Sequence, residues 1–221
     1  SFDEKMKGYI SSSSHSANLD FNNVSFNYKE SPLNFVFKKS KWKMEDHIVK
    51  IENDNFQISE SDLTFTGEID DLLLYLLDEK EKINIEGTLS SEITKFKELF
   101  TIKDINGEDD STEFVSVLPD WLDVNIIYNV KKFNYGSFHS TNFDGEIEYN
   151  SNTLKLNANN MKMNALEGDI SGDLFYYENR IHDLVLKANI ELNQVNIADG
   201  FTSFDNFGQT FITNNNFSIN I

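Results

Sequence analysis

The chain contains no cysteine among its 221 residues, and only two prolines and two tryptophans. Without cysteine it forms neither a disulfide nor a thiolate metal site, so its stability must come from packing and backbone hydrogen bonds. Its longest apolar run, Leu72–Leu77, is far shorter than the ~20 residues that a membrane-spanning helix requires. The sequence therefore gives no indication of such a helix.

Basic residues are also scarce. The 19 Lys and Arg stand against 37 Asp and Glu, which gives a formal net charge of −18 at pH 7. A surface this acidic repels phosphate backbones and anionic lipid head groups. We therefore expect no nucleic-acid partner and no electrostatic docking onto a membrane. The excess charge is interpreted as a solvated exterior that keeps the protein soluble.

Aromatic residues, in contrast, are abundant, with 19 Phe and 8 Tyr. Such side chains fit the pleated, half-buried surface of a β-sheet. Asparagine is frequent throughout the chain, and it favours turns and left-handed backbone positions over helix interiors. The composition predicts a mainly β fold.

The second half shows five successive runs in which apolar and polar residues alternate. This period of two places the apolar side chains on one face of a sheet and the polar ones on the other. The runs are Trp121–Val130, Phe143–Tyr149, Leu154–Met163, Ile170–Tyr176 and Leu184–Leu192.

Turn residues separate these runs, as at Asn150–Asn152, Glu178–Asn179 and Gly136. Short hairpins predict an antiparallel meander. A glycine-centred motif recurs, with Phe65–Ile69 resembling Phe143–Ile147, and Ile85–Leu89 resembling Ile170–Leu174. The recurrence predicts an elongated, curved sheet of similar units, which forms a groove with an apolar inner face.

The first half repeats the alternation less regularly, with an irregularity at Asn22–Asn23. Two or three short helices are predicted: near 70–78, near 90–100 with Ser90 as the N-cap, and a helical turn over 198–204. We expect a first β-groove region over 1–103, an acidic loop over 104–118 and a second region over 119–221, with one continuous domain as the alternative. The chain starts at Ser1 without methionine, and we expect it to be part of a longer protein.

Candidate catalytic and metal sites each fail a specific requirement. His15, His47, His139 and His182 are scattered without ligand spacing. The serine run around His15 resembles a linker, whereas a catalytic triad needs rigidly held residues. The acidic segment from Asp104 has glycine at its fourth position and valine at its twelfth, where a calcium-binding EF-hand needs glycine sixth and glutamate twelfth.

Paired carboxylates give no better candidate. Glu146 and Glu148 share one face, as a glycosidase requires, but it is the polar face of an alternating strand. The ten glycines are dispersed and build no phosphate-binding loop. We therefore expect a protein without catalytic residues, metal or cofactor.

The apolar face must be covered in some way. It can pack on the chain's own helices, on a second sheet as in a sandwich, or against an apolar ligand. An exposed set of aromatic residues would instead suit a carbohydrate-binding sandwich, with Trp42, Trp121, Tyr176 and Tyr177 as stacking platforms. The pattern alone leaves these alternatives open.

The region from Leu122 to Phe217 resembles the C-terminal part of AsmA-like proteins, relatives of the TamB group, in their Bacteroidota-type form. The similarity lies in the segments Phe143–Ile147, Leu154–Leu156, Leu166–Leu174, Ala188–Ile197 and Phe201–Gln209, together with an upstream unit at Leu63–Leu89. About two-thirds of the chain is covered. The stronger acidity and the lack of an N-terminal anchor depart from the family pattern.

The resemblance implies a periplasmic protein that is tethered to the inner membrane, with repeating β-grooves that give phospholipid a path in outer-membrane homeostasis. It implies an acyl-chain ligand, with envelope membrane proteins as further partners, and no active site. A structural scaffold with a closed core and the carbohydrate-binding sandwich are the alternatives. The expected groove-lining residues are Val124, Ile126, Tyr128, Ile147, Leu154, Leu156, Ala158, Ile170, Leu174, Leu186, Ile190 and Leu192.

Overall fold

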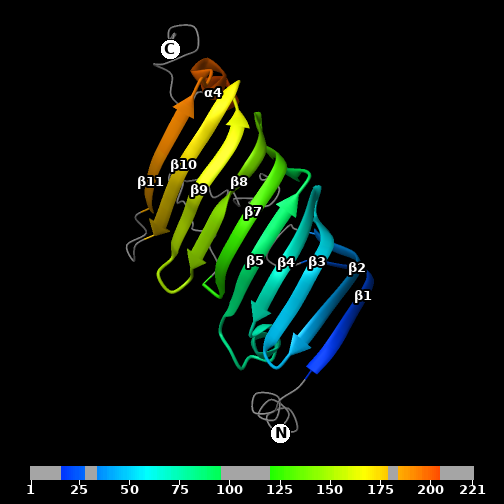
Figure 1. The fold of residues 1–221 in the computed structure, drawn as a ribbon. Coiled ribbons are helices and arrows are strands. Elements are labelled where there is room, and N and C mark those ends of the chain that lie inside the picture. Colours follow the sequence, from blue (N-terminus) through cyan, green and yellow to red (C-terminus); the bar gives the residue numbers. More distant parts are fainter. Residues whose placement is uncertain (1–15, 28–33, 96–119, 179–183, 205–221) are drawn as a thin grey trace, which may run out of the picture.

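A computed structural model describes residues 16–27, 34–95, 120–178 and 184–204. The protein is mainly β, with one open sheet of eleven strands and two short helices in the described part of the chain (Figure 1). The strands are β1 (Ser16–Asn27), β2 (Asn34–Glu45), β3 (Ile48–Ile58), β4 (Ser61–Asp70), β5 (Ile83–Ser91), β6 (Thr94–Lys95), β7 (Leu122–Tyr135), β8 (Phe138–Asn150), β9 (Lys155–Ala165), β10 (Gly168–Glu178) and β11 (Leu184–Asn193). The helices are α2 (Leu72–Leu76) and α4 (Ile197–Ser203).

Strand order follows the chain from β1 to β11, except that β6 lies off the path and pairs with β7. The neighbours within β1–β5 and within β7–β11 are antiparallel, as the alternating runs and short turns predict. The expectation of a wholly antiparallel meander is wrong at β7, because β5 and the short β6 both pair with it in parallel. The chain between them is long enough for the crossover that parallel pairing needs.

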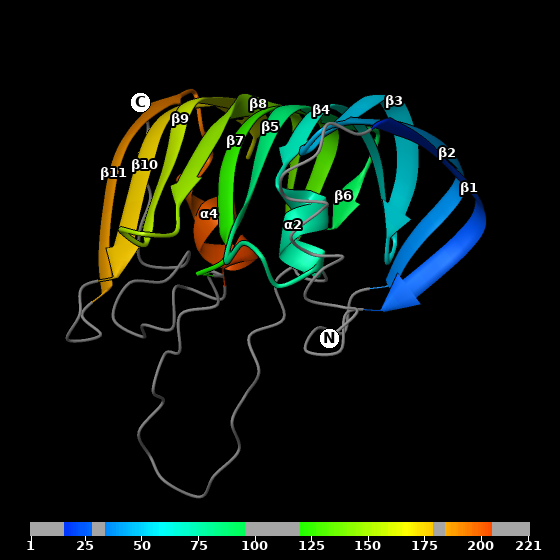
Figure 2. The ribbon, with the colours of Figure 1, turned by 90° about the horizontal axis from the view of Figure 1, so that it is seen from below.

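The sheet is strongly curved. Figure 2 shows it as an arch, with β1 and β11 at its two sides and both helices beneath its concave face. Four asparagines inside strands have left-handed backbone: Asn23, Asn53, Asn142 and Asn160. At the Asn53 and Asn160 positions the pairing register shifts as at a β-bulge, and bulges bend the strand that carries them. The frequent asparagines thus contribute to the curvature of the sheet.

The helices predicted near 70–78 and 198–204 are present as α2 and α4. The helix predicted over 90–100 is wrong in its described part, where Ser90 lies in β5 and Thr94–Lys95 forms β6. The Asp62 carboxylate accepts hydrogen bonds from the backbone N–H groups of Glu92 and Ile93, at 3.1 and 2.8 Å, which ties this segment to β4. Residues 96–100, the acidic loop over 104–118 and the Glu178–Asn179 turn beyond Glu178 lie outside the described residues.

Packing is that of a single layer. Within the described residues, only Val49, Ser40 and Ser61 have side chains that are almost wholly buried. The main apolar cluster comprises Val49, Ile51 and Phe65 in β3 and β4, and Leu72 of α2 packs against it. The described strands form one sheet rather than two, so the sandwich architecture does not apply to them. The concave face is therefore covered in part by short helices and is otherwise half-exposed.

Candidate functional site

Two rows of side chains cross all ten strands of the main path on the concave face. Their members are directly paired from strand to strand, so the rows run without interruption from one edge of the sheet to the other. We call the first the glycine row: Leu19, Trp42, Ile51, Gly67, Gly87, Ile126, Ile147, Ala158, Leu174 and Ala188. The second is the tyrosine row: Ala17, Met44, Val49, Ile69, Ile85, Val124, Tyr149, Leu156, Tyr176 and Leu186.

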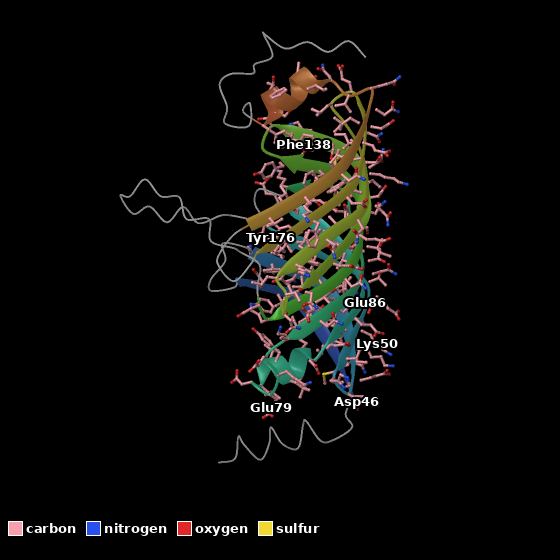
Figure 3. The ribbon with its side chains drawn as sticks, turned by 90° about the vertical axis from the view of Figure 1, so that its left-hand side faces the viewer. Asp46, Lys50, Glu79, Glu86, Phe138 and Tyr176 are labelled. Carbon is pink, nitrogen blue, oxygen red and sulfur yellow. The ribbon has the colours of Figure 1, made fainter. Side chains whose placement is uncertain are left out.

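The opposite face is polar at the corresponding positions. The row between the two apolar ones consists of Asn18, Lys43, Lys50, Glu68, Glu86, Asn125, Glu148, Asn157, Phe175 and Lys187. Figure 3 shows Lys50 and Glu86 on the convex side, whereas Phe138 and Tyr176 lie on the side of the two helices. Apart from Phe175 in β10, this row is polar, so the sheet is one-sided over most of its width.

The convex face carries the charge. On it Glu45 accepts hydrogen bonds from Lys43 and Lys50. The Lys43 hydrogen bond, followed by that of Lys50, holds the pKa of the Glu45 carboxyl below its ordinary value. Glu68 and Glu86 are direct cross-strand neighbours of like sign, an arrangement that costs stability unless a cation offsets it. Lys50 pairs with Glu68 from the other side and supplies that cation.

Several buried polar side chains interrupt the apolar character of the concave face, among them Asp54, Ser40 and Ser140. Asp54 is 5% exposed, and its carboxylate accepts a hydrogen bond of 2.6 Å from the Trp42 indole. Ser40 and Ser140 are buried, and their hydroxyls have no hydrogen-bond partner in the described part of the chain. These groups lie beneath neighbouring side chains, so they leave the face itself apolar.

Eleven of the twelve residues predicted to line a groove lie in strands on the concave face, while Leu154 lies in the turn before β9 with a left-handed φ of 49°. Tyr128 and Ala158 are buried and offer a ligand little surface. The others in β7–β10 are half-buried. In β11, Leu186, Ile190 and Leu192 are exposed by 65%, 43% and 53%.

The sequence interpretation placed no groove-lining residue in β1–β5, although half of each row lies there. Trp42, Ile51, Ile69 and Ile85 belong to the same continuous surface as Ile126 and Leu156. The alternation that identifies them is present in each short stretch. It changes phase inside β2 and β3, where two successive residues face solvent (Lys38 with Lys39, and Glu52 with Asn53).

The two helices lie on the concave side and pack through aromatic residues. Tyr75 of α2 stacks on Trp121 with ring centroids 5.6 Å apart. Phe204, the C-cap of α4, stacks on Phe138 at 5.1 Å. Figure 1 places α2 and α4 near opposite ends of the sheet. The helices thus lie at opposite ends of the strands: α2 follows the end of β4, and α4 contacts the start of β8.

No family model, no curated protein and no solved structure matches the chain. The function must therefore be argued from the geometry of the concave face.

The other candidate sites do not assemble in the described residues. Those residues contain no group of three potential metal ligands. His139 is exposed and contacts Asn134, His47 lies in the β2–β3 turn, and His15 and His182 lie outside the described ranges. Glu146 and Glu148 each approach an asparagine on the convex face at 3.5 Å.

The four aromatic residues considered for carbohydrate stacking are dispersed. Trp42 and Tyr176 lie in the apolar rows, Trp121 stacks on Tyr75, and Tyr177 contacts Phe175 on the convex face. A polar depression of about 580 Å³ exists at the ends of β5, β7, β8 and β9. Its lining is rich in asparagine and includes Asp123, Glu148 and Lys155, so its chemistry differs from that of the apolar rows. Among the described residues, no helix is long and apolar enough to cross a membrane.

Proposed function

We propose that the concave face holds lipid acyl chains, and that the protein is a non-catalytic groove segment that binds or conducts phospholipid in the cell envelope. The observation that supports this most strongly is the pair of apolar rows. Each row offers contact from β1 to β11 without a charged member. A surface of this length suits a long, flexible hydrocarbon better than a compact ligand.

The energetics favour hydrocarbon as the ligand. Most members of the rows are half-buried, so they retain apolar area that a ligand removes from water. Transfer of acyl chain from water to such a surface gains about 0.8 kcal/mol for each buried CH₂. Because this attraction has no direction, it binds acyl chains of different lengths and allows them to move along the rows. Met161 and Met163, next to the rows in β9, have flexible side chains that adapt to varied ligand shapes.

The charge distribution supports delivery by a partner rather than direct membrane contact. The convex face contains many carboxylates and the net charge is −18, so an anionic bilayer repels it. We propose that lipid reaches the concave face through envelope membrane proteins, in a periplasmic setting. The lipid head group then stays at the open side of the arch in water, and the acyl chains lie against the rows.

A structural scaffold is the second candidate, and one observation favours it. Leu72 of α2 packs on the Val49, Ile51 and Phe65 cluster, which shows that the chain covers part of this face with its own helix. If other proteins cover the remaining part, the face is an assembly surface and not a lipid path.

The test compares ligand content in matched variants. Protein purified from cells is analysed by native mass spectrometry and by organic extraction of bound lipid. Ile126→Asp, Leu156→Asp and Ile190→Asp place a charge on the concave face, and we expect each to abolish acyl-chain binding. Ile127→Asp and Asn189→Asp place the same charge on the opposite face of the same strands. These two controls should retain binding.

Circular dichroism of each variant establishes that the sheet is intact. If the Ile126→Asp and Ile127→Asp variants lose bound acyl chains to the same extent, the concave face is not the binding surface. Wild-type protein that neither carries lipid nor takes up added phospholipid would overturn the proposal and favour the scaffold.

A further inference from the structure

The last described strand of the sheet has more exposed large apolar side chains than any other described strand. Leu186, Ile190 and Leu192 all lie in β11 and are exposed by 65%, 43% and 53%. Their paired neighbours in β10 are Tyr176, Gly172 and Ile170, which are half-buried. The difference arises because β11 has a neighbouring strand on one side only, within the described residues.

This edge lacks most of the features that protect natural edge strands. Such strands usually carry bulges, prolines or several charges, which prevent pairing with another strand. β11 contains no proline, and none of its residues has a positive φ. Lys187 and Glu191 are its only charged residues, and both alternate with the apolar side chains. Within the described residues, β11 is therefore a regular edge of ten residues that can pair with a further strand.

The sheet already contains one parallel junction between two strands of the main path, and β11 can form another of the same kind. At β5 the first antiparallel set of strands ends, and β7 joins it in parallel. Both apolar rows continue across that junction, through Ile85 with Val124 and Gly87 with Ile126. β11 runs in the same direction as β5 and β7. In all three strands the residue number increases from the tyrosine row to the glycine row.

β1 has the matching direction and side chains. The tyrosine row begins at Ala17 and ends at Leu186, and the glycine row begins at Leu19 and ends at Ala188. The two edge strands are therefore parallel, and continuing both rows would place Ala17 beside Leu186 and Leu19 beside Ala188. On the convex side the same register sets Asn18 beside Lys187 and Asp20 beside Asn189. This arrangement contains no pair of like charges.

We propose that β11 of one molecule pairs in parallel with β1 of a second copy, so that the arched sheet and its apolar rows continue from one molecule into the next. The contact joins two different surfaces, head to tail, and it repeats without closing. The net charge of −18 opposes it, and salt reduces this opposition because the Debye length falls to about 8 Å at 0.15 M ionic strength. Association that increases with salt and with protein concentration is the expected behaviour.

The absence of cysteine allows a direct test of the register. In the double variant Leu19→Cys with Ala188→Cys, the two thiols lie at opposite sides of the arch within one molecule (Figure 2). A disulfide needs Cα atoms about 4.4–6.8 Å apart, so only a second copy can supply the partner thiol. Mild oxidation should give a ladder of dimers, trimers and longer chains on a non-reducing gel. Peptide mapping should identify the link between positions 19 and 188.

Two controls separate this contact from random association. Asp20→Cys with Ala188→Cys places the two thiols on opposite faces, and it should give no ladder. Ala188→Cys alone should give no disulfide-linked dimer on the gel, because the proposed contact does not bring two copies of β11 together. In the cysteine-free protein, Ile190→Lys directs a charge onto the concave face of the edge and should weaken association about tenfold or more. Asn189→Lys, on the convex face, should not weaken it.

Three results would overturn the proposal. The first is a protein that stays monomeric in analytical ultracentrifugation up to about 1 mM. The second is a ladder of equal yield in the Asp20→Cys control. The third is a dimer that is linked through position 188 alone. The proposal does not depend on the ligand of the concave face, because delipidated protein serves equally well in each measurement.

Discussion

Gly67 lies directly opposite Gly87 where β4 pairs with β5, and the Phe65 ring lies over both glycines. A Cβ atom at position 67 would be 2.7 Å from the Gly87 Cα and from the Phe65 ring, and it would also meet the Glu86 carbonyl oxygen. The two glycines thus allow a close approach that fills the centre of the glycine row with one aromatic ring.

Gly67→Ala should therefore destabilise the protein strongly, because the new methyl group meets backbone atoms that cannot move aside. We expect a loss of more than about 2 kcal/mol in the free energy of unfolding, the range of overpacked sites. Urea denaturation measures it. Gly136→Asn serves as the control, since Gly136 has open space and a φ of 58° that asparagine tolerates. Similar losses in both variants would contradict the role of the close approach.

The Trp42–Asp54 hydrogen bond should be worth more than an ordinary surface contact. Asp54 is buried, so Trp42→Phe leaves its carboxylate without the indole donor and should cost about 2–3 kcal/mol. Asp54→Asn keeps an acceptor oxygen and should cost less. In a double-mutant cycle with Trp42→Phe and Asp54→Ala, we expect a coupling energy of about 1–3 kcal/mol. Additive losses would show that the two side chains act independently.

Tyr128 should make the stability depend on alkaline pH. Its hydroxyl is buried without a hydrogen-bond partner in the described part of the chain, and this burial, with the Asp144 charge as the smaller cause, raises the pKa of Tyr128 above its ordinary value. The unfolded chain therefore loses this proton first, at about pH 10. Stability from Tyr128 is complete below that pH and falls above it, by up to about 1.4 kcal/mol for each pH unit.

Tyr128→Phe should remove this part of the alkaline slope, as measured by urea denaturation between about pH 8 and pH 11. At neutral pH the variant should differ from the wild type by no more than about 1 kcal/mol, because the hydroxyl that it removes has no partner. An unchanged slope would indicate that the hydroxyl is hydrated in solution.

The left-handed asparagines should tolerate glycine and reject β-branched residues. Asn160 of β9 has a φ of 54°, and Asn160→Val should cost about 1–2 kcal/mol or more because the Cβ crowds the backbone there. Asn160→Gly should stay close to the wild type. Lys162→Val, two residues further on the outer face of the same strand, should also be tolerated. Equal losses for Asn160→Val and Lys162→Val would contradict the conformational explanation.

Much of the fold was predictable because long stretches of β7–β11 alternate strictly between apolar and polar residues. Leu122, Val124, Ile126 and Tyr128 alternate without a break, and a period of two needs no tertiary information. The short hairpin turns then predict antiparallel neighbours. The irregularity at Asn22–Asn23 was also recognisable, and Asn23 has a φ of 52°.

The first half of the apolar face was harder to recognise because an extra residue reverses the alternation. In β3 the concave side holds Val49 and Ile51 before Asn53, but Asp54 and Phe56 after it. A strict period of two assigns one of these pairs to the wrong face. Asp54 is a further obstacle, because a buried carboxylate with an indole partner does not resemble a core residue in sequence.

The parallel junction and β6 depend on contacts between distant residues. Thr94 and Lys95 pair with Phe133 and Asn134 of β7, and nothing local to residues 90–95 indicates this. Ser90 and Glu92 do match a helix start in sequence. The Asp62 carboxylate and β7 decide the outcome in the folded protein, and tertiary contacts of this kind override local preference.

The β5–β7 junction also determines the order of assembly. Every antiparallel pair in this sheet joins strands that follow each other closely in the chain, whereas Ile83 and Leu122 of the junction are about forty positions apart. Closing that loop costs conformational entropy before any contact across it forms. We therefore expect the two halves of the arch to form first and to join in a slower step. Until they join, each partly formed groove exposes apolar surface, and such surface favours aggregation.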